Sequence, residues 1–221
     1  MKYILKFLKL INFKSIYFNL KYLPFKYAIR LPIFVSNKVF LLEAKGAIKI
    51  DAPISTGMIL IGYGNIGIFD KKRSRSIWQV YGNVIFNGKA NIGHGCKISV
   101  GKDAEISFGD GFTVSAETQI ISHKKIKFGK NVLISWDCLF IDTDFHKIFD
   151  KSGRRINSPK PIIIGDKVWI GCRNVILKGS KVSDGSIIAA NSFLNKDISE
   201  QSGIFIGNPI QFVKGQIYWE H

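Results

Sequence analysis

The sequence has only three cysteines among its 221 residues, Cys96, Cys138 and Cys172, and none lies in a C-x-x-C arrangement. Three cysteines cannot all pair, which argues against a disulfide framework and favours a reduced, cytoplasmic location. We expect Cys96 and Cys138 to pack as small apolar side chains. Closely spaced cysteine and histidine ligands are also missing, so the sequence predicts no metal site.

Long hydrophobic runs are missing as well. The longest uncharged stretch, 52–69, contains Pro53 and several glycines that would interrupt a lipid-exposed helix, so we expect no transmembrane helix. We interpret this stretch as a first, irregular coil. Lysines interrupt the apolar residues near Met1, and no small-residue cleavage site follows them, so we expect no secretory signal. A hydrophobic content of 46% suits one domain with appendages.

Acidic residues are absent from residues 1–42, and this segment supplies half of the formal net charge of +16. Its aromatic residues are embedded among leucine and isoleucine. The basic residues are Lys2, Lys6, Lys9, Lys14, Lys21, Lys26, Arg30 and Lys38, and the aromatic residues include Phe7, Phe13, Tyr17, Phe18, Tyr22, Phe25, Tyr27 and Phe34.

This composition favours an amphipathic segment on an anionic membrane surface. A nucleic-acid-binding arm, the competing interpretation, would carry more glycine, serine, asparagine or glutamine between its charges. Packing against the rest of the chain or against a neighbouring subunit is a third alternative. The pairs Leu23-Pro24 and Leu31-Pro32 predict short helical pieces rather than one long helix.

From Ile164 to Ile198, apolar residues recur every six positions, a period typical of a left-handed parallel β-helix. Four positions after each of them stands a mostly small side chain, as the tight interior of a triangular coil requires. The same spacing continues upstream in groups of three apolar residues, and each group predicts the three faces of one coil. Ile120 and Phe128 are eight residues apart, which predicts a two-residue bulge at one corner. The positions are Ile164, Ile170, Ile176, Val182, Ile188 and Leu194, the residues four positions later Val168, Asn174, Ser180, Ser186, Ser192 and Ile198, and the triples Phe86, Ile92, Ile98; Phe108, Val114, Ile120; Phe128, Ile134, Phe140.

The longest interruption of the repeat is the mostly polar segment 141–161. A loop that leaves a regular solenoid is a natural position for function. It contains His146, with Asp142 and Asp144 just before it. An imidazole can remove a proton from a hydroxyl group near neutral pH, and a carboxylate bonded to its far nitrogen would hold the tautomer. We therefore predict His146 as a general base oriented by Asp144 or Asp142. The alternative is that either aspartate only caps the loop.

Two other histidines are weaker candidates for a base. His94 lies in the corner Gly93-His94-Gly95, where we expect a solvated side chain. His123 stands beside Lys124-Lys125, where we expect it to be exposed.

Motifs in the second half of the chain resemble the hexapeptide-repeat O-acetyltransferases, whose design the galactoside, maltose and serine acetyltransferases share. The basic N-terminal segment is similar to that of members which acetylate bacterial capsular or lipopolysaccharide sugars. The motifs are Val168-Trp169-Ile170-Gly171, Ile188-Ala189-Ala190-Asn191-Ser192, Asn195-Lys196-Asp197, and Gly207-Asn208-Pro209 followed by Lys214.

The resemblance implies acetyl transfer from acetyl-coenzyme A, with His146 as the catalytic histidine that precedes the Trp169 motif. Ala189-Ala190-Asn191 replaces the glycine-alanine-glycine common in relatives, which would narrow the cofactor groove. Lys196 and Lys214 would meet the cofactor's phosphates. A nucleophilic Cys172 is the alternative to direct transfer. The implied cofactor contacts are Cys172, Ala190, Asn195, Lys196 and Lys214.

These features predict a mainly β fold: a left-handed β-helix over 46–199 with its catalytic loop, a basic, partly helical segment over 1–45, and a C-terminal segment over 200–221. We predict an O-acetyltransferase for a sugar hydroxyl of a cell-surface polysaccharide or its precursor. We expect a homotrimer with sites at the interfaces between its subunits. We also expect a saccharide acceptor and no nucleic-acid partner. The expected location is cytoplasmic, with peripheral contact at the inner membrane face. The alternatives are an N-acetyltransferase of an amino sugar or xenobiotic, and an inactive structural or binding solenoid.

Overall fold

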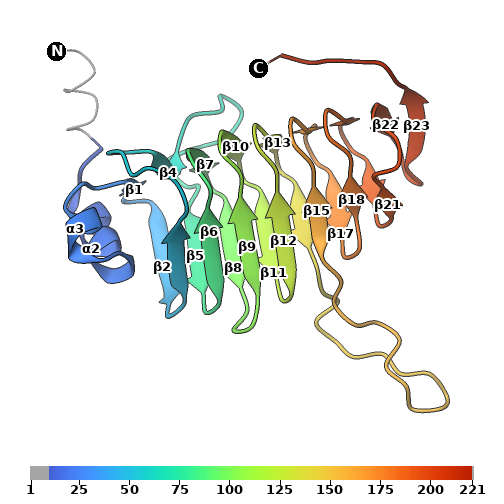
Figure 1. The fold of residues 1–221 in the computed structure, drawn as a ribbon, viewed down its shortest axis with the longest axis horizontal. Helices are drawn as coiled ribbons and strands as arrows, with labels where there is room; N and C mark the ends of the chain where they lie inside the picture. Colours follow the sequence, from blue (N-terminus) through green and yellow to red (C-terminus); the bar gives the residue numbers. More distant parts are fainter. Residues whose placement is uncertain (1–9, 221) are drawn as a thin grey trace.

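A left-handed parallel β-helix makes up most of the computed structural model, which describes residues 10–220 (Figure 1). Each coil contributes one strand to each of three sheets, and the chain passes from sheet A to sheet B to sheet C before it starts the next coil. We name the lines of corners between the sheets the A–B, B–C and C–A edges. The predicted fold class is therefore confirmed.

The strands of each sheet follow the coils in order along the prism. Sheet A contains β1 (Ile33–Val35), β4 (Ile59–Tyr63), β7 (Ala90–His94), β10 (Phe112–Ala116), β13 (Leu133–Trp136), β16 (Trp169–Ile170), β19 (Ile187–Ile188), β22 (Ile204–Ile206) and β23 (Gln211–Lys214). Sheet B contains β2 (Val39–Ala44), β5 (Ser76–Val80), β8 (Lys97–Val100), β11 (Gln119–Ser122), β14 (Leu139–Ile141), β17 (Val175–Leu177) and β20 (Phe193–Leu194). Sheet C contains β3 (Ala47–Ile50), β6 (Asn83–Phe86), β9 (Glu105–Phe108), β12 (Lys125–Phe128), β15 (Ile162–Ile164), β18 (Lys181–Val182) and β21 (Asp197–Ile198).

The strand register confirms the predicted six-residue repeat, in which each repeat (a hexad) begins with an apolar residue, its head. Phe86, Phe108 and Phe128 pair across sheet C, and their rings stack inside the prism with centroids 5.2 and 5.6 Å apart. The small residues four positions after each hexad head are buried, as Ser180 and Ser186 illustrate. Because every coil adds the same apolar layer, burial of this column supplies most of the stability of the body.

The β-helix begins earlier than the predicted residue 46. Its first coil consists of β1, β2 and β3, and the pairing of β2 with β5 is irregular between Leu41 and Glu43. This irregularity hides the six-residue period in the sequence. The interpretation of 52–69 as the first coil is wrong, because this stretch contains a corner, β4 of the second coil and the start of the loop 64–75.

Two short helices, α2 (Phe13–Tyr22) and α3 (Phe25–Ala28), lie at the N-terminal end of the prism (Figure 1). The Asn12 side chain caps α2 by accepting from the backbone N–H of Ser15 at 3.0 Å. Two short helices replace one long helix, as the proline pairs predict: α2 ends before Leu23-Pro24, and α3 ends three residues before Leu31. Within residues 10–220, no helix has the length and apolar character needed to cross a membrane.

Candidate active site

The regular body is interrupted at the B–C edge, where residues 142–161 project between β14 and β15 (Figure 1). We call this segment the arm. Its two halves run antiparallel, with a bridge between Phe149 and Arg155 and a hydrogen bond from the Ile156 N–H to the Ile148 carbonyl at 2.9 Å. Asp150 closes the tip by accepting from the backbone N–H groups of Ser152 and Arg154. The arm is thus an ordered hairpin rather than a simple corner.

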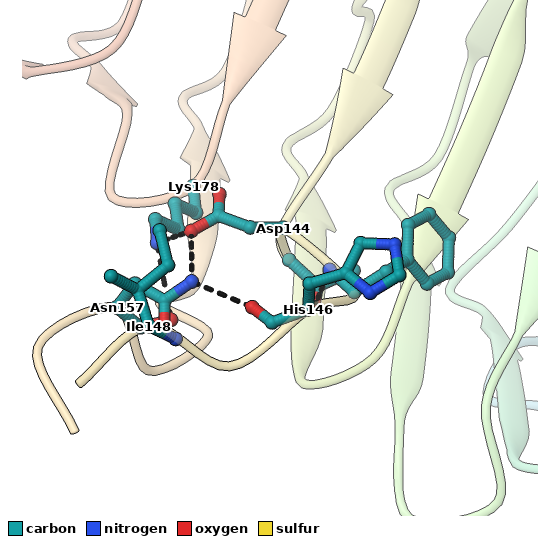
Figure 2. A network of polar contacts seen from close by, with 7 residues as sticks. Asp144, His146, Ile148, Asn157 and Lys178 are labelled. Atoms are coloured by element: carbon teal, nitrogen blue, oxygen red, sulfur yellow. Dashed lines mark hydrogen bonds and ion pairs between the residues drawn. The ribbon is translucent and has the colours of Figure 1, made fainter.

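One buried amide, that of Asn157, fixes the base of the arm (Figure 2). Its Nδ2 donates to Asp144 Oδ2 and to the backbone carbonyl of His146, both at 2.8 Å. Its Oδ1 accepts from the Ile148 N–H at 2.7 Å. The amide therefore uses both of its ends to hold the backbone at His146 and Ile148, and it also binds the side chain of Asp144. Sequence reasoning passed over Asn157, because a loop asparagine has no distinguishing signal until its partners are known.

Asp144 lies beside His146 in sequence, but its carboxylate faces Asn157 and Lys178 (Figure 2). The hydrogen bond from Lys178 holds the pKa of this carboxyl below its usual value. Lys178 Nζ also donates to the Asn157 carbonyl at 3.2 Å. The side chain of His146 is exposed. Asp144 is thus connected to the backbone of His146 through Asn157, and in the described structure it makes no hydrogen bond to the imidazole.

Asp142, the other aspartate considered for this role, is fully buried and anchors a different segment. Its carboxylate accepts from the Ser122 hydroxyl at 2.8 Å and from the backbone N–H groups of His123, Lys124 and Lys125 at 2.6 to 2.9 Å. These residues form the two-residue bulge that the spacing from Ile120 to Phe128 predicted. Asp142 therefore positions the corner that carries His123, and its acceptor capacity is used there.

His123 is exposed, as expected, and lies close to the arm. Its ring stands edge-on to that of Phe145, with centroids 5.0 Å apart. A groove of about 380 Å³ runs from this pair along the B–C edge, and Tyr81 supplies a further aromatic wall. Gln79 and Ser99 line it too, joined by a 3.0 Å hydrogen bond. Tertiary structure thus brings a second histidine beside the residue that precedes His146.

The predicted cofactor contacts lie at three places on the coils. Cys172 and Ala190 occupy the A–B edge in consecutive coils, where the Asn191 N–H donates to the Cys172 carbonyl at 2.9 Å. A Cβ on Gly171 would lie 2.6 Å from the Ala190 N, so this corner requires glycine for the coils to approach. Cys172 is half-buried and Ala190 is exposed.

Asn195 and Lys196 lie on the B–C edge, between β20 and β21, and are exposed. They share this edge with Lys178 and the base of the arm. Lys214 is exposed on β23, which pairs antiparallel with β22. Within one chain, the Cys172 and Ala190 corner is therefore on a different edge of the prism from His146.

The remaining histidine in the described structure, His94, is buried, so the expected solvated side chain is wrong. The loop 64–75 covers it, and the Phe69 ring lies edge-on with centroids 6.2 Å apart. Neither ring nitrogen has a hydrogen-bond partner among residues 10–220. Desolvation by burial lowers its pKa, while Glu117 acts in the opposite direction. The residues next to His94 in the sequence could not reveal that a loop from another coil covers its side chain.

Cys96 and Cys138 are buried, which confirms the packing prediction, and burial raises the pKa of each thiol to about 12. Such thiols are inert as nucleophiles. In the described part of the chain, no group of three or more histidine, cysteine or acidic side chains is placed to hold a metal ion.

Comparison with known proteins finds acetyltransferases among the relatives, although no protein-family model matches the sequence. A polysialic acid O-acetyltransferase of Escherichia coli O1:K1 / APEC is 33% identical over 120 residues, which are 53% of this chain and 39% of that protein. An uncharacterized 24.8 kDa protein in the cps region of Klebsiella pneumoniae is 27% identical over 144 residues, which are 63% of this chain and 62% of that protein. The chain thus spans less than two thirds of the length of either relative.

Among solved structures, the polysialic acid O-acetyltransferase OatWY aligns with a TM-score of 0.52 at 21% identity, over 86% of this chain and 90% of that one. This likeness shows that the two proteins share the β-helix fold. In both sequence and fold, the chain resembles the hexapeptide-repeat acetyltransferases, as its motifs predicted.

Proposed function

We propose that the protein is an acetyl-coenzyme A dependent O-acetyltransferase that acts on a sugar hydroxyl of a cell-surface polysaccharide or its precursor. The observation that carries this proposal is the exposed imidazole of His146 on an arm whose backbone is fixed by Asn157. A side chain that is free on a rigid support can meet a substrate without first breaking a hydrogen bond. The acetyltransferases among the relatives support the reaction class.

In the proposed reaction, the neutral imidazole of His146 accepts the proton of the acceptor hydroxyl. The oxygen attacks the thioester carbonyl and forms a new C–O bond, while backbone N–H groups stabilise the oxyanion. The C–S bond then breaks, and the imidazolium returns its proton to the leaving thiolate. The products are the acetyl ester and free coenzyme A, so atoms and charge balance without a covalent enzyme intermediate.

We further propose a homotrimer in which each site is shared between two copies. The support is the separation of the predicted contacts: Cys172 and Ala190 lie on the A–B edge, whereas His146 lies on the B–C edge of the same chain. In the proposed trimer, a heterologous interface around a threefold axis brings one copy's A–B edge against the next copy's B–C edge. Pantetheine would then run past Ala190 of one copy and below the arm of its neighbour.

The acceptor saccharide is proposed to lie in the groove beside the arm. Aromatic rings from Tyr81 and Phe145 present apolar faces to a sugar ring, and the polar side chains of Gln79, Ser99 and His123 can hydrogen-bond its hydroxyls. The groove ends next to the residue that precedes His146. A polysaccharide acceptor suits an elongated surface groove better than a closed cavity.

Titration of the full chain with coenzyme A tests the proposed cofactor. We expect binding that Ala190→Leu obstructs and that Lys196→Ala weakens more for coenzyme A than for dephospho-coenzyme A, if Lys196 meets the 3′-phosphate. Lys102→Ala, at an exposed corner, is the matched control. Equal losses for the two cofactors would remove the phosphate role of Lys196. Absence of coenzyme A binding would favour an inactive solenoid, and transfer only to amino groups would favour an N-acetyltransferase.

Mixed trimers test the shared site. Copies carrying His146→Ala and copies carrying Ala190→Leu should each be weakly active alone. If each site takes its groove from one copy and its arm from the next, refolding the two variants together restores activity to some of the sites. Mixtures that stay at the level of the separate variants would contradict a shared site.

A further inference from the structure

Helix α2 faces the β-helix with two polar side chains, Ser15 and Asn19, beside the buried Phe18, whose ring lies edge-on to Trp78 with centroids 5.3 Å apart. It packs beside β1, the first strand of sheet A, whose outer edge has no neighbouring strand within residues 10–220. Ser15 Oγ accepts from the Val35 N–H at 2.9 Å and donates to the Val35 carbonyl at 3.2 Å. Asn19 does the same for Ile33, with its Oδ1 3.2 Å from the N–H and its Nδ2 2.6 Å from the carbonyl. The helix therefore closes the open edge of the sheet with two side chains that mimic a strand.

The consequence is an apolar face that points away from the protein. Phe13, Ile16, Tyr17 and Leu20 are spaced one helical turn apart and are all exposed, with Phe13 83% and Leu20 52% accessible. We call these four residues the end stripe. On α3, Phe25 is 72% and Ile29 60% accessible. An ordinary surface helix turns charged and polar side chains to solvent, so an exposed apolar stripe of this kind marks an interaction surface.

The charges around the end stripe have one sign. Lys21, Lys26 and Arg30 are exposed and form no ion pair within residues 10–220. The nearest acidic residues in sequence, Glu43 and Asp51, are each paired with a lysine at 3.2 Å. Lys14 and Lys38, in contrast, donate to backbone carbonyls. Three uncompensated cations thus flank an apolar helix face.

We propose that this end of the prism docks on an anionic lipid bilayer, with the end stripe among the acyl chains near the headgroups and Lys21, Lys26 and Arg30 at the lipid phosphates. Lipid fits better than a nucleic acid, because phosphodiester backbones offer nothing to exposed Phe13 and Leu20, whereas a bilayer offers both acyl chains and phosphates. Figure 1 shows α2 and α3 at the end of the prism, so docking there leaves its three faces free.

A groove next to α3 has the same combination of properties. It measures about 440 Å³ and is lined by apolar residues such as Leu23, Tyr27 and Ile48, with Arg30 and Lys49 also in its wall. The apolar surface of the end stripe therefore continues towards β3, with Arg30 at its wall. Lys49 is paired with Asp51 at 3.2 Å, so this extension enlarges the surface available to lipid without a change in net charge.

Vesicle binding by the full chain tests the proposal without any variant. We expect binding to vesicles of phosphatidylcholine mixed with phosphatidylglycerol and much weaker binding to phosphatidylcholine alone. Binding should fall as salt is raised from about 0.15 M to 1 M, where the Debye length shrinks from about 8 to 3 Å. Equal binding to both lipids, or no binding to either, would overturn the proposal.

Variants then assign the surface. Lys21→Gln, Lys26→Gln and Arg30→Gln together should weaken binding to the anionic vesicles by about 100-fold, since each cation at such a surface contributes about fivefold. The control combines Lys89→Gln, Lys102→Gln and Lys127→Gln, three exposed lysines on the body with the same total charge change. If both triple variants lose binding equally, net charge rather than this end is responsible, and the proposal fails.

Phe13→Ser and Leu20→Ser together test the apolar part, with Ile68→Ser and Ile206→Ser as controls at other exposed positions. We expect only the first pair to reduce vesicle binding, with the oligomeric state in sedimentation unchanged. A changed oligomeric state with unchanged vesicle binding would instead identify a second copy of the chain as the occupant. Unfolding measurements identify any misfolded variant, and the lipid and salt dependence of the unaltered chain still decides the proposal.

Discussion

The body of the β-helix and the arm are held together in opposite ways. In the body, large apolar side chains such as Phe108 and Phe128 are buried in a column, and many equivalent layers share the stability. In the arm, Phe145, Ile148 and Phe149 are exposed, and the segment depends on one buried amide and its partners. A redundant body can tolerate a polar site without losing its fold, whereas the contacts of Asn157 at the base of the arm are not repeated in a neighbouring layer.

At the N-terminal end, α2 has two different faces: Ser15, Phe18 and Asn19 are buried against the β-helix, whereas the end stripe is exposed. There, too, a few hydrogen bonds help to fix the position of the segment, and an apolar surface is left for the proposed partner. Both departures from the repeat therefore expose side chains that we propose to meet other molecules.

The largest expected effect is the loss of acetyl transfer on substitution of His146, a residue of the arm. His146→Ala should lower acetyl transfer by about 10² to 10⁴, the usual contribution of a positioned general base. Its unfolding temperature should stay the same, because the side chain is exposed. His123→Ala is the matched control, and should raise KM for the acceptor without a comparable loss of kcat. Near-normal turnover in the His146 variant would reject its role as base.

The two aspartates should differ in what they stabilise. Asp142→Asn replaces an acceptor-only group by one that presents N–H to several backbone donors, so it should lower the free energy of unfolding by about 1 to 3 kcal/mol. Asp144→Asn should change that free energy by less than about 0.5 kcal/mol and act on turnover instead. Denaturant unfolding checks both values. An Asp144 variant that unfolds as easily as the Asp142 variant would mean that the arm, too, carries the stability of the fold.

Asn157→Asp tests whether the arm positions His146 through its backbone. The substituted carboxylate keeps the acceptor for the Ile148 N–H but loses both donor bonds and repels Asp144. We expect kcat to fall by about tenfold, because small displacements of a catalytic group are costly, while KM for acetyl-coenzyme A stays unchanged. Asn83→Asp, an exposed substitution on β6, supplies the control. A rise in KM for the cofactor with unchanged kcat would assign Asn157 to cofactor binding.

The smallest effect concerns His94 in the body. Because burial lowers its pKa in the folded chain below the ordinary value of 6.5, only the unfolded chain binds the proton between these two values. The free energy of unfolding should therefore fall as the pH drops below 6.5 and stay level with respect to this group above it. His94→Gln should reduce the slope in unfolding experiments at several pH values. Identical slopes would show that His94 titrates normally.

Much of the fold could be predicted because its signal repeats. The frame that places Ile92, Val114 and Ile134 on one sheet appears in the sequence many times, so local irregularities do not obscure it. The first coil was missed because its pairing is irregular and offers no such average. In the loop, the position of His146 on an interruption was visible from the spacing, but Asn157 and Lys178 were not, because their roles depend on contacts between distant residues.

The sequence by itself determined the β-helix, its strand register, the corner at 122–125 and the short helices before Pro24 and Pro32, because each depends on residues a few positions apart. Only the tertiary structure decided that Asp142 anchors the corner of His123, that Asp144 meets Lys178, and that α2 presents the end stripe outward. Coiling the chain places residues about twenty positions apart side by side, and the identity of the neighbour then determines what a carboxylate or an asparagine does.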